Sequence, residues 1–231
     1  MIYFFIASYV HVCGRKDPNY DQCFLDNINN MKAQFCSGIP ELNVSPVEPV
    51  IVDKMVIYDT NNLKLFFQDT KIFGVCNFDV LSFNISPDKF YIDFTFLLKH
   101  LNMDTVYDID IRLLVSLANK GIAHISVDNV NGKLSVQFKE VTQNGKTEIY
   151  VSKANTNFDI LDKNFTYEFD DNEKNLVQLH QAIRHTVSEN EKEILRKIKP
   201  LIEENVSKLV IEIGNNVTYN RFYQLFPDVA P

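Results

Sequence analysis

The chain has 231 residues, of which 45% are hydrophobic and 23% charged, a balance typical of a globular protein with one large domain or two small ones. Its formal net charge is −7 and no basic stripe is visible, which argues against nucleic acid or an anionic membrane surface as a partner. Only 7 glycines are present, so there is little material for glycine-rich phosphate-binding loops.

The N-terminus opens with an apolar run from Met1 to Val10 that is too short to span a bilayer. It resembles the hydrophobic region of a secretory signal peptide that lacks its basic start, and the alternative is a buried first strand. We predict a truncated signal-peptide remnant at 1–12, a single domain at 13–231, no other transmembrane segment, and an extracellular location. Three acceptor triplets for N-glycosylation agree with secretion: Asn164-Phe165-Thr166, Asn205-Val206-Ser207 and Asn216-Val217-Thr218.

The chain has 4 cysteines, which allow three full pairings. Cys13 and Cys23 bracket a polar turn, where a local disulfide would hold the start of the domain in place. Cys36 and Cys76 are either paired or buried as free thiols, and the sequence does not decide between these. Because no CxxC spacing occurs, no metal site is expected.

Residues 24–35 predict a short helix with one apolar side, which Gly38 and Pro40 end. From Val50 to about Phe169 the hydrophobic period changes to two. This alternation predicts an antiparallel sheet with one buried face. The clearest strand candidates are 63–68, 90–98, 107–117, 158–161 and 165–169.

Two dipeptides, Asn131-Gly132 and Asn144-Gly145, lie between alternating segments. Asn-Gly readily supplies the positive φ angles of a type I′ turn. Both are therefore predicted to be hairpin turns.

Residues 187–217 predict a long helix, preceded by a separate short one at 178–184. Ser188 and Glu191 have the spacing of a capping box at its start, and Gly214 is expected to stop it. Pro200 predicts a bend, because proline removes one backbone donor and clashes with the preceding turn. The apolar stripe runs through both halves of the helix: Ile194, Ile198, Leu201, Ile202, Val206, Leu209, Ile213 and Val217.

The long antiparallel sheet has one apolar face to bury, and the long helix has one apolar stripe to bury. A sheet curled around the helix buries both of these surfaces. The core is then either fully packed or hollowed into an apolar tunnel. The candidate tunnel wall comprises the apolar sides of the long strands and of the central helix: Phe94, Phe96, Ile109, Ile111, Leu113, Val136, Phe138, Ile194, Ile198, Ile202, Val206 and Leu209.

No set of residues predicts catalysis. The chain contains no GxSxG, HExxH, P-loop or GxGxxG pattern, and its 5 histidines form no recognisable set with serine and aspartate. We therefore expect a protein that is not an enzyme and needs no cofactor.

Several short motifs resemble the insect juvenile-hormone-binding and takeout family in order and spacing. They are the Cys13 to Cys23 segment, Gly38-Ile39-Pro40-Glu41-Leu42, Val47-Glu48-Pro49, the strand Tyr107 to Val115, Asn144-Gly145-Lys146-Thr147, Lys199-Pro200-Leu201-Ile202-Glu203-Glu204 and Phe226-Pro227. Ile111 stands where the family usually has glycine, and Cys36 and Cys76 are additional to its pattern. These departures favour the takeout-like branch.

The resemblance implies an α+β fold in which a long bent C-terminal helix is wrapped by a highly curved antiparallel sheet that encloses an elongated apolar tunnel. It implies a Cys13–Cys23 disulfide and a secreted haemolymph carrier of a small hydrophobic ligand, such as a juvenile-hormone-like terpenoid or a fatty acid derivative. No stable membrane insertion is expected, and protein partners are not predicted. The alternative is a ligand-independent extracellular signalling protein that acts through its surface.

Overall fold

The computed structural model describes residues 11–86, 91–112, 116–143, 145–160, 165–170 and 177–229. The expected signal-peptide residues therefore lie almost entirely outside the described part. The elements are α1 (Tyr20–Ser37), the short 3-10 helix η1 (Pro40–Leu42), β1 (Val50–Asp59), β2 (Leu63–Phe73), β3 (Phe78–Ser86), β4 (Tyr91–Arg112), β5 (Ser116–Gln143), β6 (Lys146–Asp159), β7 (Phe165–Phe169), α2 (Val177–Thr218) and α3 (Phe222–Leu225).

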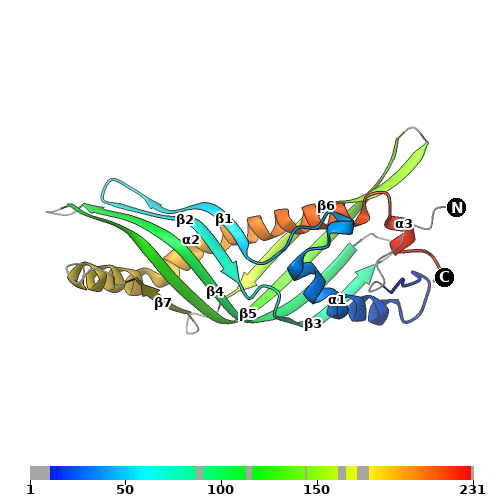
Figure 1. The fold of residues 1–231 in the computed structure, drawn as a ribbon, viewed down its shortest axis with the longest axis horizontal. Coiled ribbons are helices and arrows are strands. Elements are labelled where there is room, and N and C mark those ends of the chain that lie inside the picture. The colour runs from blue at the N-terminus through cyan, green and yellow to red at the C-terminus, as the bar shows by residue number, and fades with distance from the viewer. Residues whose placement is uncertain are drawn as a thin grey trace.

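The strands form one antiparallel sheet in the order β1-β2-β4-β5-β6, with β3 added to β4 and β7 added to β5. β4 and β5 pair from Tyr91 opposite Gln137 to Arg112 opposite Ser116. Because these two strands are so long, each has room for two shorter neighbours on its other side: β2 and β3 along β4, and β6 and β7 along β5. The result is a long, twisted sheet (Figure 1).

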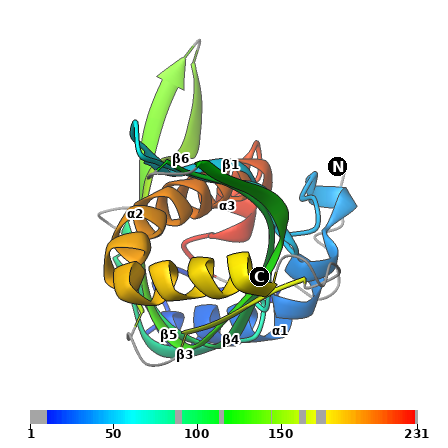
Figure 2. The ribbon, with the colours of Figure 1, turned by 90° about the vertical axis from the view of Figure 1, so that its left-hand side faces the viewer.

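α2 runs through the concave side of this sheet (Figure 2). It contains 42 residues, which corresponds to a length of roughly 60 Å at ~1.5 Å per residue. The helix continues through Pro200 and its axis changes direction along its length, so it follows the curvature of the sheet (Figure 2). The predicted α+β architecture, a long bent C-terminal helix wrapped by an antiparallel sheet, is confirmed.

The predicted start of the long helix and the role predicted for Gly214 are wrong, whereas the predicted last residue, Val217, is next to the observed one, Thr218. The segment 178–184 belongs to α2 itself, and Ser188 lies inside the helix, where its hydroxyl donates to the carbonyl of His185 at 2.9 Å. Gly214 does not stop the helix either. It lies against β6, where an added Cβ would be 2.5 Å from Cγ2 of Val151, so the glycine permits close packing of helix and strand.

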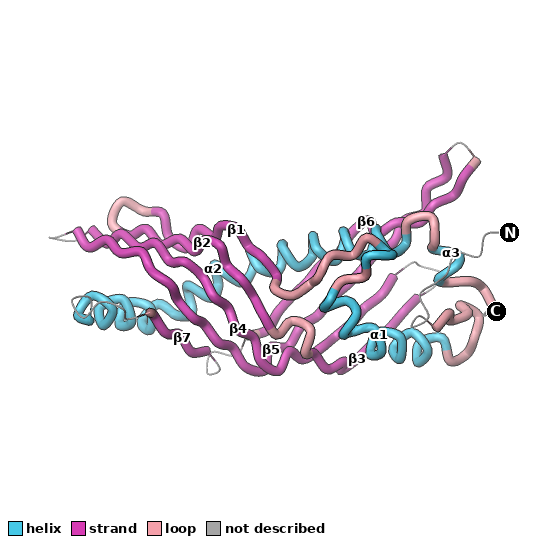
Figure 3. The backbone as a smooth tube through the Cα atoms, in the orientation of Figure 1, coloured by secondary structure: helices cyan, strands magenta, loops and turns pink. Residues whose placement is uncertain are grey.

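One of the two predicted hairpin turns is also wrong. β5 passes straight through Asn131 and Gly132, whereas the two-residue turn between Gln143 and Lys146 is confirmed by the pairing of β5 with β6. The predicted continuous strand 107–117 is interrupted, because the chain reverses between Arg112 and Ser116. The end of the β5–β6 hairpin projects from the body of the molecule (Figure 3).

Side chains of α2 complete the hydrogen bonding of β6 at the edge that β5 does not use. Glu203 Oε1 accepts from the backbone N–H of Phe158 at 2.7 Å, and Ser207 Oγ accepts from that of Thr156 at 3.0 Å. Asn215 accepts from the N–H of Val151 at 2.7 Å and donates to its carbonyl. The helix thus takes the place of a further strand along this edge.

Among the described helices, none is both long and apolar enough to cross a membrane. At the end of the molecule that holds α1 and α3 (Figure 1), the segment before α1 binds the C-terminal segment. Arg15 N–H donates to the carbonyl of Pro227 at 2.8 Å, and Lys16 Nζ lies 2.7 Å from a carboxylate oxygen of Asp228.

Candidate ligand-binding cavity

A cavity of about 400 Å³ lies between α1, α2 and the strands β3 to β6. Its volume is within the range of small-molecule binding sites. Eight phenylalanines contribute to its wall: Phe24, Phe35, Phe78, Phe83, Phe94, Phe96, Phe138 and Phe158. The remaining wall is largely aliphatic, so the cavity presents an apolar surface of the kind that binds hydrophobic molecules.

The phenylalanine rings hold one another in place. Phe94 and Phe96, neighbours on one face of β4, stack with their centroids 5.3 Å apart. Phe78 meets Phe94 edge-on at 5.7 Å, and Phe158 meets Phe96 edge-on at 6.3 Å. Offset and edge-to-face contacts of this kind favour fixed ring positions, so this part of the wall is pre-formed.

The structure brings six of the twelve predicted wall residues to the large cavity: Phe94, Phe96, Val136, Phe138, Val206 and Leu209. All six come from β4, β5 or α2, as the alternation of the strands and the helical stripe require.

Four other predicted wall residues line smaller cavities beside the part of α2 that precedes Val206. Ile198 and Ile202 line a second cavity of about 70 Å³, which shares Val206 with the large one. Ile109 and Ile194 line a third cavity of about 30 Å³, which shares Ile198 with the second. The interior therefore contains a series of cavities along the helix that narrows away from α1.

Two predicted wall residues fall outside all three cavities. Ile111 is half-buried and packs against the main core cluster. Leu113 lies outside the described residues.

The sequence analysis missed the contribution of α1 to the wall. Phe24, Ile28 and Phe35 form the apolar side predicted for this helix, and they face the cavity. Phe24 also stacks on Phe83 of β3 with the ring centroids 5.2 Å apart. The signal was present in the apolar spacing of the helix, but the sequence did not show which part of the sheet the helix would cover.

Both cysteine pairs form disulfides. Cys13 is joined to Cys23, and Cys36 at the end of α1 is joined to Cys76 in the turn between β2 and β3. The second bridge resolves the choice between paired and free thiols. Both of its cysteines line the large cavity, so this disulfide fixes α1 over the sheet at the cavity wall.

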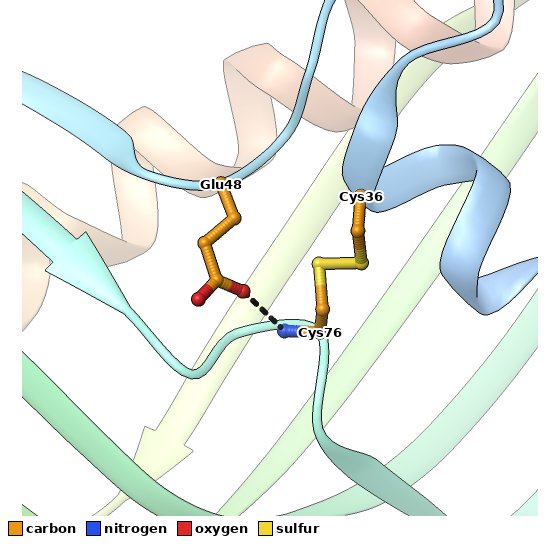
Figure 4. Close-up of side chains that lie close together, drawn as sticks. All are labelled: Cys36, Glu48 and Cys76. Atoms are coloured by element: carbon orange, nitrogen blue, oxygen red, sulfur yellow. Dashed lines mark hydrogen bonds between the residues drawn. A yellow bond between two sulfur atoms is a disulfide. The ribbon is translucent and has the colours of Figure 1, made fainter.

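Glu48 lies beside the second disulfide (Figure 4). Its carboxylate accepts from the backbone N–H of Gly74 at 2.7 Å and from that of Cys76 at 3.3 Å. The three side chains are close enough together to suggest a metal site, but the two sulfur atoms are bonded to each other and are not thiolate ligands. The group therefore holds the turn between β2 and β3 in position.

The groups with perturbed pKa values lie apart from the large cavity wall. Burial raises the pKa of Tyr20 to about 12, against the opposing charge of Arg15. The hydrogen bond that the His124 ring donates to the carboxylate of Asp104 raises the pKa of His124, with a further contribution from Asp170, and all three side chains are substantially exposed. What the cavity can do chemically is to remove an apolar molecule from water.

Comparison with known proteins agrees with this architecture. The family model described as haemolymph juvenile hormone binding protein (JHBP) matches residues 3–227. The chain is 23% identical over 225 residues to the circadian clock-controlled protein daywake of Drosophila melanogaster, an alignment that covers 88% of this chain and 84% of that protein.

Among solved structures, the crystal structure of Takeout 1 from Epiphyas postvittana superposes with a TM-score of 0.69. The superposition covers 90% of this chain and 95% of that chain at 17% sequence identity, which establishes a shared fold.

Proposed function

Because this chain belongs to the haemolymph juvenile hormone binding protein family, we propose that it is a secreted carrier of a small hydrophobic ligand, held in the cavity between α1, α2 and the sheet. The two disulfides support an oxidising, extracellular setting, since such bonds are rare in reducing compartments. The observation that carries the proposal is the cavity of about 400 Å³ with its phenylalanine-rich wall.

Binding in this site is driven by burial. Removal of apolar surface from water gains about 25 cal/mol per Å², or about 0.8 kcal/mol for each methylene group. A flexible chain also loses conformational entropy when it is confined, which reduces the net gain. Affinity should therefore rise with chain length until the cavity is filled.

The shape of the interior favours an elongated ligand. The large cavity shares five wall residues with the second one: Val50, Val75, Leu98, Phe158 and Val206. A linear terpenoid or a fatty acid derivative matches a series of apolar spaces along one helix better than a compact polycyclic molecule does.

An alternative role acts through the surface, as a ligand-independent signalling protein. The feature that favours it is the projecting end of the β5–β6 hairpin (Figure 3), where Val141 and Tyr150 are exposed. In that case the protein would function with its cavity empty or blocked.

Filling the cavity tests the carrier proposal. Leu209→Trp places a larger side chain in the wall of the large cavity and should weaken binding of a fluorescent apolar probe by about tenfold or more, the equivalent of about 1.4 kcal/mol. Leu25→Trp, on α1 but outside the cavity wall, is the matched control and should bind the probe as the unmodified protein does. Equal probe binding by both variants, each folded, would contradict the proposal.

A further inference from the structure

α1 places one charged residue in the face that it turns toward the cavity. The wall residues of this helix are Phe24, Ile28, Lys32, Phe35 and Cys36, which recur at steps of three and four residues and so share one side. Lys32 occupies a position in that pattern where an apolar side chain is expected. Among the described residues of the wall, it is the only one with a charged side chain.

The ammonium group of Lys32 is held at a defined place. Its Nζ donates to the backbone carbonyl of Phe78 at 2.7 Å and lies 4.3 Å from the centroid of the Phe78 ring. An ammonium group has three N–H donors, so this carbonyl leaves two of them available. The aliphatic stem of the half-buried side chain lies along the apolar wall.

No carboxylate of the described residues pairs with Lys32. Cys36 follows Lys32 by one turn of α1, and the carboxylate of Glu48 lies near it. That carboxylate accepts from the backbone N–H groups of Gly74 and Cys76 instead of pairing with Lys32. By contrast, Arg15, which lines a separate small pocket beyond Phe24, is paired with Asp228.

We propose that Lys32 anchors the carboxylate of a long-chain carboxylic acid whose hydrocarbon chain fills the cavity. This inference rests on the proposed carrier function and adds the head-group chemistry of the ligand. An ionised carboxylate is strongly disfavoured beside an apolar wall unless a cation and hydrogen-bond donors meet it. The ammonium of Lys32 supplies both, so the site should prefer an acid to the corresponding methyl ester, which buries a similar chain.

Competition against a fluorescent apolar probe tests this preference, with hexadecanoic acid and its methyl ester as the two ligands. The unmodified protein should bind the acid more tightly than the ester. Lys32→Met, which keeps an unbranched side chain without the charge, should bind the acid about tenfold or more weakly, a factor typical of a lost hydrogen bond to a charged group. Its affinity for the ester should change by less than about twofold, because the apolar contacts remain.

Two further variants separate anchoring from a structural role. Lys32→Arg keeps the charge and should retain the preference for the acid. Lys54→Met, the matched control, removes a lysine whose Nζ lies 4.7 Å from the Phe66 ring centroid, outside the cavity wall, and should leave both affinities unchanged. If Lys32 only fastens α1 to Phe78, Lys32→Met will lower the melting temperature and weaken acid and ester equally, which overturns the proposal.

The unmodified protein gives an answer even if Lys32→Met does not fold. Equal affinity for acid and ester, or a preference for the ester, overturns the assignment of Lys32 and leaves the carrier function standing. Failure to bind the acid, the ester and the probe alike overturns the carrier function itself.

Discussion

The ring of Phe96 on β4 lies directly over Gly132, its pairing partner on β5. A Cβ added at position 132 would be 2.2 Å from Cζ of that ring, a distance that no pair of non-bonded atoms tolerates. The glycine is therefore required by the cavity wall, because the absence of a side chain leaves room for the ring.

Gly132→Ala should push the Phe96 ring away from β5. The ring is enclosed by Phe78, Phe94 and Phe158, so its displacement disturbs the wall and the cavity together. We expect a loss of about 1–3 kcal/mol in the free energy of unfolding, as for other overpacked cores, and weaker probe binding. Urea denaturation and probe titration measure the two effects.

Gly121 provides the control for this substitution. It pairs with Tyr107 on the same two strands, and an added Cβ would be 2.8 Å from the phenol oxygen, away from the large cavity. Gly121→Ala should lower stability without changing probe affinity. If Gly121→Ala reduces probe affinity as much as Gly132→Ala does, the effect is not specific to the wall.

The Cys36–Cys76 disulfide should contribute more to stability than the Cys13–Cys23 disulfide. The bridged cysteines are 40 residues apart in the Cys36–Cys76 disulfide and 10 residues apart in the Cys13–Cys23 disulfide. In the chain-entropy account a disulfide that closes a longer loop stabilises the folded protein more, by about 4 kcal/mol for the first and about 3 kcal/mol for the second. Thermal unfolding of the two double serine variants, one for each bridge, measures this order. The opposite order would mean that α1 is held mainly by its other contacts.

Probe binding should distinguish the same two variants. Only the bridge between Cys36 and Cys76 lines the cavity, so only its loss should weaken binding in a protein that remains folded.

His124 should make stability depend on pH. Its Nδ1 lies 2.7 Å from Asp104 and its Nε2 lies 3.3 Å from Asp170, and these carboxylates raise its pKa in the folded state above the ordinary 6.5. A group whose pKa is raised on folding contributes its full stabilisation to the folded protein at pH values below its unfolded-state pKa. This contribution is lost as the pH rises through the folded-state pKa. The difference in melting temperature between the unmodified protein and His124→Gln should therefore be larger at about pH 5 than at about pH 9.

The imidazole titration in an NMR experiment checks the cause directly. Asp104→Asn should lower the pKa of His124, and an unchanged value would show that Asp104 is not responsible.

The junction between α2 and β6 should depend on Asn215. Its side chain both accepts from and donates to the backbone of Val151, so Asn215→Ala leaves two half-buried backbone groups without partners. We expect a cost of about 1–3 kcal/mol in the free energy of unfolding. Asn216→Ala, which removes one exposed hydrogen bond to Asn43, should cost less, and an equal cost would contradict the role given to Asn215.

The sequence predicted the architecture because its apolar periods are long and uninterrupted. The alternation in β4 and the stripe along α2 each require one buried face, and only a sheet around a helix provides both. The turn at Gly145 was also predictable, since its φ of 75° is the positive angle that the Asn-Gly signal indicates.

Two of the errors, at Gly132 and Gly214, arose where a distant contact decides the role of a residue. Gly132 and Gly214 carry the local signals of a turn and of a helix end, yet each is small because Phe96 or Val151 packs against it. Such contacts join residues far apart in the chain, and a local pattern does not contain them. For the same reason the position of Lys32 in the cavity wall became visible only when α1 was placed against the sheet.

Native mass spectrometry of the purified protein, followed by organic extraction of what it carries, tests the central claim most directly. The carrier account predicts a stoichiometric apolar small molecule that is released by the solvent, and renewed uptake of one equivalent of hexadecanoic acid by the extracted protein. A protein that shows only its own mass, and takes up neither that acid nor a linear terpenoid when they are offered, would contradict it.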